Sequence, residues 1–166
     1  MRILGVDSSG MVASVALVED DLLVAEYSVN YKKTHSQTLL PMLDEIVKMT
    51  ELDLNTIDAI AVAAGPGSFT GLRIGAATVK GLGLALEKPV ISVPTCHGLA
   101  YNLWGSDKLI CPIMDARRSQ VYTGIYEFTK DGMQVLLDQS AMDIRALAEK
   151  LNAMGREVIF LGDGCP

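Results

Sequence analysis

With 166 residues, 49% of them apolar and 20% charged, the chain can bury the core of one domain or two small lobes, which excludes a disordered segment. Its formal charge of −6 excludes a surface that holds nucleic acid unaided, because that affinity comes chiefly from Lys and Arg neutralising phosphates. The three cysteines follow no metal-ligand spacing, and no apolar run approaches the ~20 residues of a membrane span. We therefore expect a soluble protein of the reducing cytosol, with neither a disulfide framework nor a zinc site.

The first half of the chain opens with a predicted antiparallel meander. Short apolar runs, the last two separated by the acidic turn 19–21, predict strands at 2–7, 12–18 and 22–29. Thr34 and Gln37 have the spacing of a capping box, so a helix is expected over about 35–50. Pro41 is expected to bend that helix.

A glycine-rich turn then precedes a second, longer helix. The expected elements are a strand at 57–64, a helix ending near residue 86, a strand at 90–93 and a short helix at 95–104. The turn is Gly65-Pro66-Gly67, and either Ser68 or Thr70 can cap the helix that follows.

The second half repeats this order of elements. Strands are predicted at 109–115, 121–128, 134–137 and 158–161. Asp143 is expected to cap the helix before the last strand, and Gly155 to end it. A β-β-β-α-β unit thus occurs twice, which predicts two lobes, 1–105 and 106–166, the second of them incomplete at its C-terminus.

Duplication of such a unit resembles the actin, hexokinase and heat-shock-protein ATPase superfamily, in which two lobes face one another across a nucleotide cleft. The expected fold is therefore α/β, with duplicated lobes of the actin-like ATPase (ribonuclease H-like) type. Element order by itself does not assign a function, so the function has to be sought in particular residues.

Four stretches match a narrower family. They are ILGVDSS at 3–9, HSQTLLP at 35–41, GPGSFTGLRIG at 65–75 and DARRSQVY at 115–122. These stretches resemble the successive signatures of TsaB (YeaZ-type) proteins, and the third is the most specific. The resemblance implies a non-catalytic paralogue of TsaD, which transfers a threonylcarbamoyl group from its adenylate to the adenosine beside the tRNA anticodon.

The same resemblance implies the partners of this chain. They are a TsaD-type catalytic subunit and a TsaE-type ATPase, with a homodimer when the protein is alone and tRNA contact only through the complex. It also implies a cytoplasmic protein with no catalytic residue and no cofactor of its own. Two alternatives stay open, namely an ATP- or metal-dependent enzyme of the same superfamily and a stand-alone homodimeric binding module.

The positions of the superfamily's phosphate loops carry the argument against catalysis. Nucleotide-binding members have Gly two residues after the first-strand Asp, so that the backbone can close on phosphate. Here Asp7 is followed by Ser9 at that place, and Asp115 is followed by Arg117 and Arg118 with no glycine in the turn. We interpret these five residues as vestigial nucleotide-site positions, with magnesium-linked aspartates as the alternative.

Other catalytic motifs are also incomplete. TsaD carries two histidines four residues apart on one helix, whereas His97 has no such neighbour and His35 is better explained by the first turn of its helix. Ser68 does not lie in a Gly-x-Ser-x-Gly elbow, and Gly71 is followed by Leu72 rather than by Lys. The sequence therefore predicts no metal site, no hydrolase nucleophile and no Walker A loop.

Glycines inside the second long helix need a reason, since each costs roughly 0.5–1 kcal/mol relative to alanine. Gly71 and Gly75 leave a groove that another helix can approach, and the alternative is packing against the chain's own sheet. The resemblance favours the first, because TsaB and TsaD are understood to meet through the two helices of their N-terminal lobes. The predicted partner surface comprises Leu39, Leu43, Phe69, Gly71, Leu72, Gly75, Val79 and Leu82.

Overall fold

The computed structural model describes residues 1–31 and 34–165. The chain forms two compact units, Met1–Val93 and Pro94–Pro166. The division falls twelve residues earlier than the boundary expected from the sequence, after residue 105. None of the helices in the described part of the chain is long and apolar enough to span a membrane.

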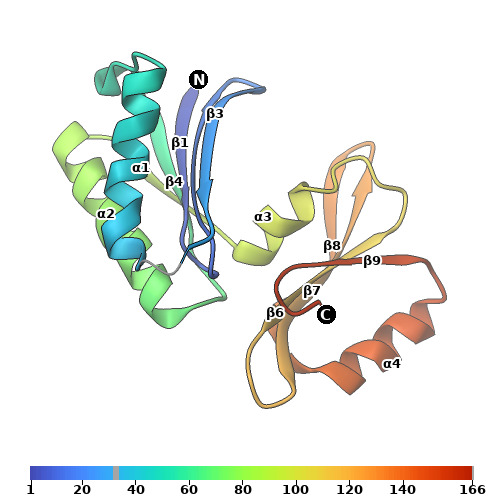
Figure 1. Ribbon diagram of the computed structural model, residues 1–166. Helices are drawn as coiled ribbons and strands as arrows, with labels where there is room; N and C mark the ends of the chain where they lie inside the picture. The colour runs from blue at the N-terminus through green and yellow to red at the C-terminus, as the bar shows by residue number, and fades with distance from the viewer. Residues whose placement is uncertain (32–33, 166) are drawn as a thin grey trace. The chain divides into compact units, whose positions relative to one another are not determined.

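The first unit is a mixed sheet with both of its long helices on one face (Figure 1). Its strands are β1 (Arg2–Asp7), β2 (Ala13–Glu19), β3 (Leu22–Val29), β4 (Ala59–Ala63) and β5 (Val90–Val93). Its helices are α1 (His35–Met49), the short 3-10 helix η1 (Leu54–Thr56) and α2 (Phe69–Leu86). The strand order is β3-β2-β1-β4-β5, with β1 antiparallel to β2 and parallel to β4.

Alternation along the central strands builds the core of this unit. Leu4 and Val6 of β1, and Ile60 and Val62 of β4, are buried toward the helices, because successive side chains of a strand point to opposite faces. Val79 of α2 meets them with no exposed surface. The core thus lies between the sheet and the helix layer, and the helix faces turned away from it are exposed.

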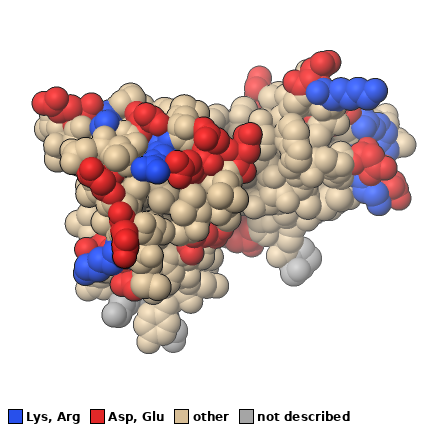
Figure 2. Space-filling view, turned by 90° about the horizontal axis from the view of Figure 1, so that it is seen from above, with Lys and Arg blue, Asp and Glu red and all other residues tan. Residues whose placement is uncertain are grey.

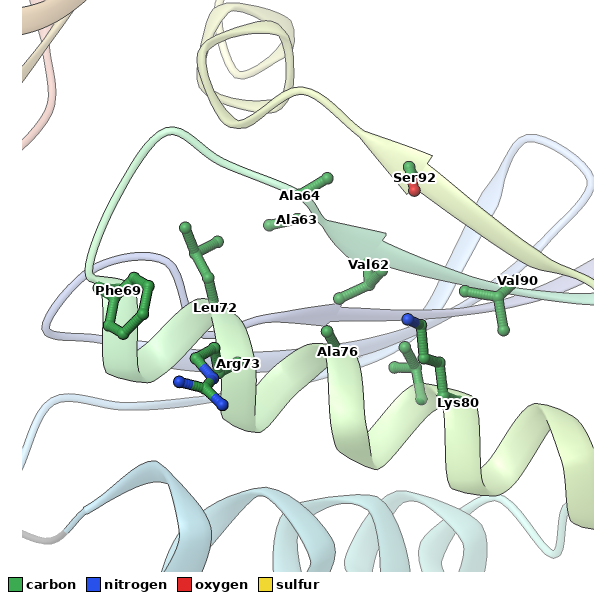
Figure 3. A pocket seen from close by; sticks show the side chains of 11 residues that line it. Val62, Ala63, Ala64, Phe69, Leu72, Arg73, Ala76, Lys80, Val90 and Ser92 are labelled. Atoms are coloured by element: carbon green, nitrogen blue, oxygen red, sulfur yellow. The ribbon is translucent and has the colours of Figure 1, made fainter.

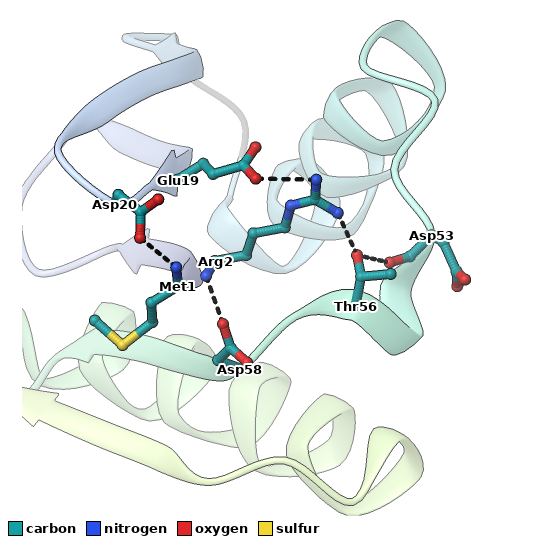
Figure 4. Close-up of polar contacts among 7 residues, drawn as sticks. All are labelled: Met1, Arg2, Glu19, Asp20, Asp53, Thr56 and Asp58. Carbon is teal, nitrogen blue, oxygen red and sulfur yellow. Dashed lines mark hydrogen bonds and ion pairs between the residues drawn. The ribbon is translucent and has the colours of Figure 1, made fainter.

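A cluster of polar contacts ties the start of β1 to both neighbouring strands (Figure 4). The N-terminal amine pairs with Asp20, and the Arg2 guanidinium lies 3.0 Å from a Glu19 carboxylate oxygen. The Arg2 backbone amide donates to Asp58 over 2.7 Å, just before β4. Exposed pairs of this kind contribute less than about 1 kcal/mol each, so their main effect is on strand register.

The second unit repeats the β-β-β-α-β order around its own sheet, which confirms the predicted duplication. Its elements are α3 (Thr95–Tyr101), β6 (Leu109–Asp115), β7 (Gln120–Thr129), β8 (Gly132–Asp143), α4 (Ile144–Met154) and β9 (Val158–Leu161). The strand order is β8-β7-β6-β9, with β6 and β9 parallel. β8 is longer than the predicted strand 134–137, because its polar second half also pairs with β7.

Helices cover both faces of the second sheet. Leu147 of α4 packs with Cys111 of β6, whereas Cys96 of α3 packs with Ile110, the adjacent residue on the opposite face. Tyr126 of β7 completes the cluster around α3. These buried contacts attach α3 to the second unit and explain why the division precedes it.

Helix caps follow the sequence signals with one exception. Ser68 accepts a hydrogen bond from the amide three residues on, Asp143 accepts one from the amide two residues on, and Gly155 ends α4 with φ 61°. The capping box predicted at the start of α1 is wrong, since Thr34 makes no side-chain cap. Its hydroxyl lies 3.0 Å from that of Ser36 instead.

Candidate partner-binding surface and strand-end loops

The loop after β1 is closed by the beginning of α2. Asp7 accepts a 2.7 Å hydrogen bond from the Ser9 amide, and the Ser8 hydroxyl donates to the Gly71 carbonyl over 2.9 Å. The Ser68 amide donates to the Ser9 carbonyl over 2.6 Å. Ser8 and Ser9 are almost fully buried. The groups at the place of a phosphate loop are therefore already bonded within the chain.

The glycines predicted to accept a partner helix face this loop. A Cβ atom added at Gly71 would lie 2.0 Å from the Ser8 carbonyl oxygen, and one added at Gly75 would lie 2.4 Å from the Ser8 hydroxyl oxygen. The prediction that Gly71 and Gly75 form an outward groove is thus wrong. The alternative, packing against the chain's own sheet, describes both glycines better, because they face the loop at the end of β1 and Gly75 also lies against Val62 of β4.

Most other members of the predicted partner surface also lie inside the first unit. Leu39, Leu43 and Val79 are buried in its core, and Leu82 packs against that core. These residues are core residues and not surface residues, which corrects that part of the prediction. Leu72 is half-buried. Phe69 is the member with a large exposed fraction, 73%.

The exposed side of the helix layer carries different residues. Leu84 is 83% exposed and Leu40 is 55% exposed, and Ala77 and Gly81 are also exposed. A Cβ atom added at Gly81 would meet nothing within 4 Å. We call Leu40, Ala77, Gly81 and Leu84 the helix-pair surface. The sequence contained the signal, since positions 77, 81 and 84 lie opposite the buried stripe 71/75/79/83, but periodicity did not reveal which stripe meets the sheet.

The loop after β6 starts with the same turn but is exposed. Asp115 accepts a 2.7 Å hydrogen bond from the Arg117 amide, as Asp7 does in the first unit. Arg117, Arg118 and Ser119 have φ values of 64°, 54° and 59°, a conformation that costs a non-glycine residue roughly 1–2 kcal/mol. All three side chains are exposed.

Both histidines have structural contacts. The His35 ring nitrogen Nε2 lies 2.9 Å from the Gly10 carbonyl oxygen, which anchors α1 beside the β1 loop. His97 packs edge-on against the ring of Tyr126, with ring centroids 5.2 Å apart. Within residues 1–31 and 34–165, no group of three His, Cys, Asp or Glu side chains is placed to hold a metal ion.

A groove of about 400 Å³ lies between α2 and the strands β4 and β5 (Figure 3). Its walls are mainly apolar, and Arg73 and Lys80 of α2 also line it. On the face visible in Figure 2, by contrast, carboxylates are spread over the first unit, and the basic side chains there are few and separate from one another. The groove is therefore an apolar, locally cationic feature of an acidic molecule.

Comparisons of sequence place the chain near two named groups of proteins. The profile of TsaD, tRNA N6-adenosine threonylcarbamoyltransferase, matches residues 23–160. The Bacillus subtilis tRNA threonylcarbamoyladenosine biosynthesis protein TsaB is 40% identical over 164 residues, which cover 98% of this chain and 71% of that protein.

Comparisons of structure agree with these matches. YeaZ from Pseudomonas aeruginosa has a TM-score of 0.75 and 31% identity over 86% of this chain and 66% of that chain. This chain thus spans about two thirds of the length of the solved relative. The ROK hexokinase of Thermus thermophilus has a TM-score of 0.50 and 17% identity over 82% of this chain and 48% of that chain, a likeness that shows the fold alone.

Proposed function

The chain belongs to the TsaB (YeaZ) family, which is homologous to TsaD, and on this premise we propose that it is a non-catalytic subunit that pairs with a TsaD-type transferase. Family membership places the chain in the biosynthesis of threonylcarbamoyladenosine in tRNA. The pairing, and the assignment of the transfer reaction to the partner, go further and rest on the geometry of the two strand-end loops and of the helix layer.

The loops support the non-catalytic role. A phosphate loop presents free backbone amides to its ligand, whereas here the Ser9 and Ser68 amides are bonded to Asp7 and to the Ser9 carbonyl. The corresponding turn of the second unit places Arg117 and Arg118 where a close backbone approach needs glycine. This is the observation that carries the proposal, since it leaves the reaction to a partner.

The helix-pair surface is the proposed contact with that partner. Leu84 exposes a large apolar side chain opposite the buried stripe of α2, and Leu40 exposes a second one on α1. Gly81 lets a second helix approach closely, because a Cβ atom added there would meet no atom of another described segment within 4 Å. The TsaD profile spans both helices, so a homologous partner can present its own helix pair in a pseudo-symmetric arrangement.

The remaining partners follow from the same arrangement. In the absence of the transferase, the helix-pair surface pairs two copies of this chain. A TsaE-type ATPase joins the assembled complex in the cytoplasm. tRNA also binds through the complex, because the formal charge of −6 gives this chain little affinity for phosphates by itself.

The test measures binding to the TsaD-type protein of the same organism by calorimetry. Gly81→Leu and Leu84→Glu should each weaken pairing at least ~30-fold, the scale of an interface hot spot of about 2 kcal/mol. Gly75→Leu cannot serve, since its side chain would strike the Ser8 hydroxyl inside the unit.

The matched control is Gly98→Leu in α3, where an added Cβ atom also meets nothing within 4 Å. This variant should pair with unchanged affinity. Unaltered pairing of both helix-layer variants would place the interface elsewhere. A wild-type chain that neither binds the transferase nor stimulates modification of tRNA in a reconstituted assay would overturn the proposed function itself.

A further inference from the structure

The helix layer of the first unit does not extend over its whole sheet. Neighbouring strands lie about 4.8 Å apart and packed helices 8–10 Å apart, so one helix covers about two strands. In the described residues this sheet has five strands, with α1 over β2 and β3 and α2 over β1 and β4. α2 reaches β5 closely near its C-terminal end, where Gly83 packs on Val90. The place of a third helix, above β5, is left open.

The groove described above lies in that place. Val62 of β4 and Val90 and Ser92 of β5 form its floor, and Leu72 and Ala76 of α2 form part of its wall (Figure 3). Ser92 and Val90 point to the helix side of the sheet, because they pair in register with Val62 and Ile60, which are buried there. The groove is therefore a mainly apolar channel beside α2, at the position above β4 and β5 that a third helix would occupy.

Two cations of α2 border this channel. Arg73 and Lys80 are seven residues apart, which places them about 10 Å from one another along the helix. Figure 3 shows the Lys80 side chain extending from α2 toward the sheet. Among the residues that the structure describes, the ion pairs involve neither of them, and Arg73 stacks on the Phe69 ring at 5.3 Å. An occupant with carboxylates would find both cations available.

We propose that this groove binds an acidic amphipathic helix of a partner protein, lying alongside α2 over β5. Its apolar side chains would enter between Leu72, Ala76 and Val90, and two carboxylates about seven residues apart would meet Arg73 and Lys80. This surface is the flank of α2 that faces β5, whereas the helix-pair surface faces away from the sheet. The proposal goes beyond pairing with a transferase and does not depend on it.

The experiment selects binders from a display library of 18-residue helical peptides whose apolar face and two flanking positions seven residues apart are randomised. The bait is the whole chain. Selected peptides should carry Asp or Glu at both flanking positions. Their affinity should fall at least tenfold for Ser92→Glu, which places a carboxylate on the floor of the groove where it repels an acidic peptide, and should rise for Ser92→Lys.

The matched control is Ile91→Glu, on the neighbouring residue of β5, which points to the opposite face of the sheet and is 43% exposed. This change should leave peptide affinity unaltered, and circular dichroism confirms that each variant is folded. The absence of enriched peptides, enrichment without acidic residues, or equal losses for Ser92→Glu and Ile91→Glu would overturn the proposal. So would a homodimer that Ser92→Glu dissociates and Gly81→Leu does not, because the occupant would then be a second copy of this chain.

Discussion

The two units contain the same strand-end turn in different surroundings. In each, an aspartate at the end of the first strand accepts a 2.7 Å hydrogen bond from the amide two residues later, Asp7 from Ser9 and Asp115 from Arg117. The first turn is buried under the start of α2, whereas the second is exposed and holds three non-glycine residues at positive φ. Both units thus use the aspartate as a turn-forming residue, and neither turn contains, two residues later, the glycine that a phosphate loop requires.

Close glycine packing is the second feature that the units share. A Cβ atom at Gly67 would lie 2.3 Å from the Ser9 carbonyl oxygen, and one at Gly162 would lie 2.4 Å from the Ile113 carbonyl oxygen. In both units, the turn after the parallel strand is therefore pressed against the first strand or the loop that follows it. What differs is the next helix, since α2 buries the first turn through Ser8 and Gly71.

The largest expected effect comes from breaking that burial. Gly71→Ala should destabilise the chain by more than about 3 kcal/mol, because its Cβ atom would lie 2.0 Å from a backbone oxygen that cannot move without shifting the β1 loop. Gly81→Ala, the same change ten residues later in the same helix, should stabilise it by about 0.5–1 kcal/mol. Urea unfolding of both variants measures the difference. Equal effects would show that the β1 loop does not depend on α2.

Alkaline unfolding tests the core of the second unit. Burial raises the pKa of Cys96 from 9.0 to about 12 and also raises the pKa of Cys111. A raised folded-state pKa means that the unfolded chain loses its proton first, so stability should fall as pH rises between about 9 and 12. The loss that Cys96 contributes should be about 1 kcal/mol at pH 10, and Cys111 should change stability in the same direction.

Thermal melting from pH 7 to 10 measures this loss, and Cys96→Ala should reduce its slope. Because the core of the first unit contains no cysteine among its described residues, a probe placed in that unit should show a smaller alkaline shift. An identical pH dependence for Cys96→Ala and the wild type would exclude the thiol as the cause.

Removing the steric cost of a positive φ in the exposed turn after β6 should have the smallest measurable effect on stability. Arg118 has φ 54°, where glycine has no steric cost, so Arg118→Gly should stabilise the second unit by about 0.5–1 kcal/mol. Arg145→Gly is the opposite control, since this residue lies in α4 and glycine there should destabilise by a similar amount. A destabilising Arg118→Gly would mean that the arginine side chain makes a contact that supports the turn.

The comparison of the two turns also predicts that the isolated chain does not bind ATP tightly. With both turns lacking the phosphate-loop glycine, the isolated chain should show no magnesium-dependent ATP binding of micromolar affinity in a calorimeter. The catalytic homologue serves as the positive control. A tight, magnesium-dependent site on this chain alone would favour the alternative of an ATP-dependent enzyme.

Local pattern was sufficient for much of the fold. Apolar alternation located the strands of both units, and the cap signals at Ser68, Asp143 and Gly155 located helix ends, because these effects act between residues a few positions apart. The sequence also shows that no glycine stands two residues after Asp7 or Asp115. A backbone can come close to a phosphate only where the residue type allows it, so this feature needs no tertiary structure to be recognised. The sequence by itself thus determined the order of elements and the interpretation of both turns.

Tertiary contacts decided which surfaces remain free. α2 carries small residues on two sides, and only the packing of Ser8, 63 residues before Gly71, shows that Gly71 and Gly75 face inward and Gly81 outward. The same applies to α3, whose attachment to the second unit depends on burial of Cys96 against Ile110. Helical periodicity defines faces without saying what each face meets, because burial is settled by chain segments far away in the sequence.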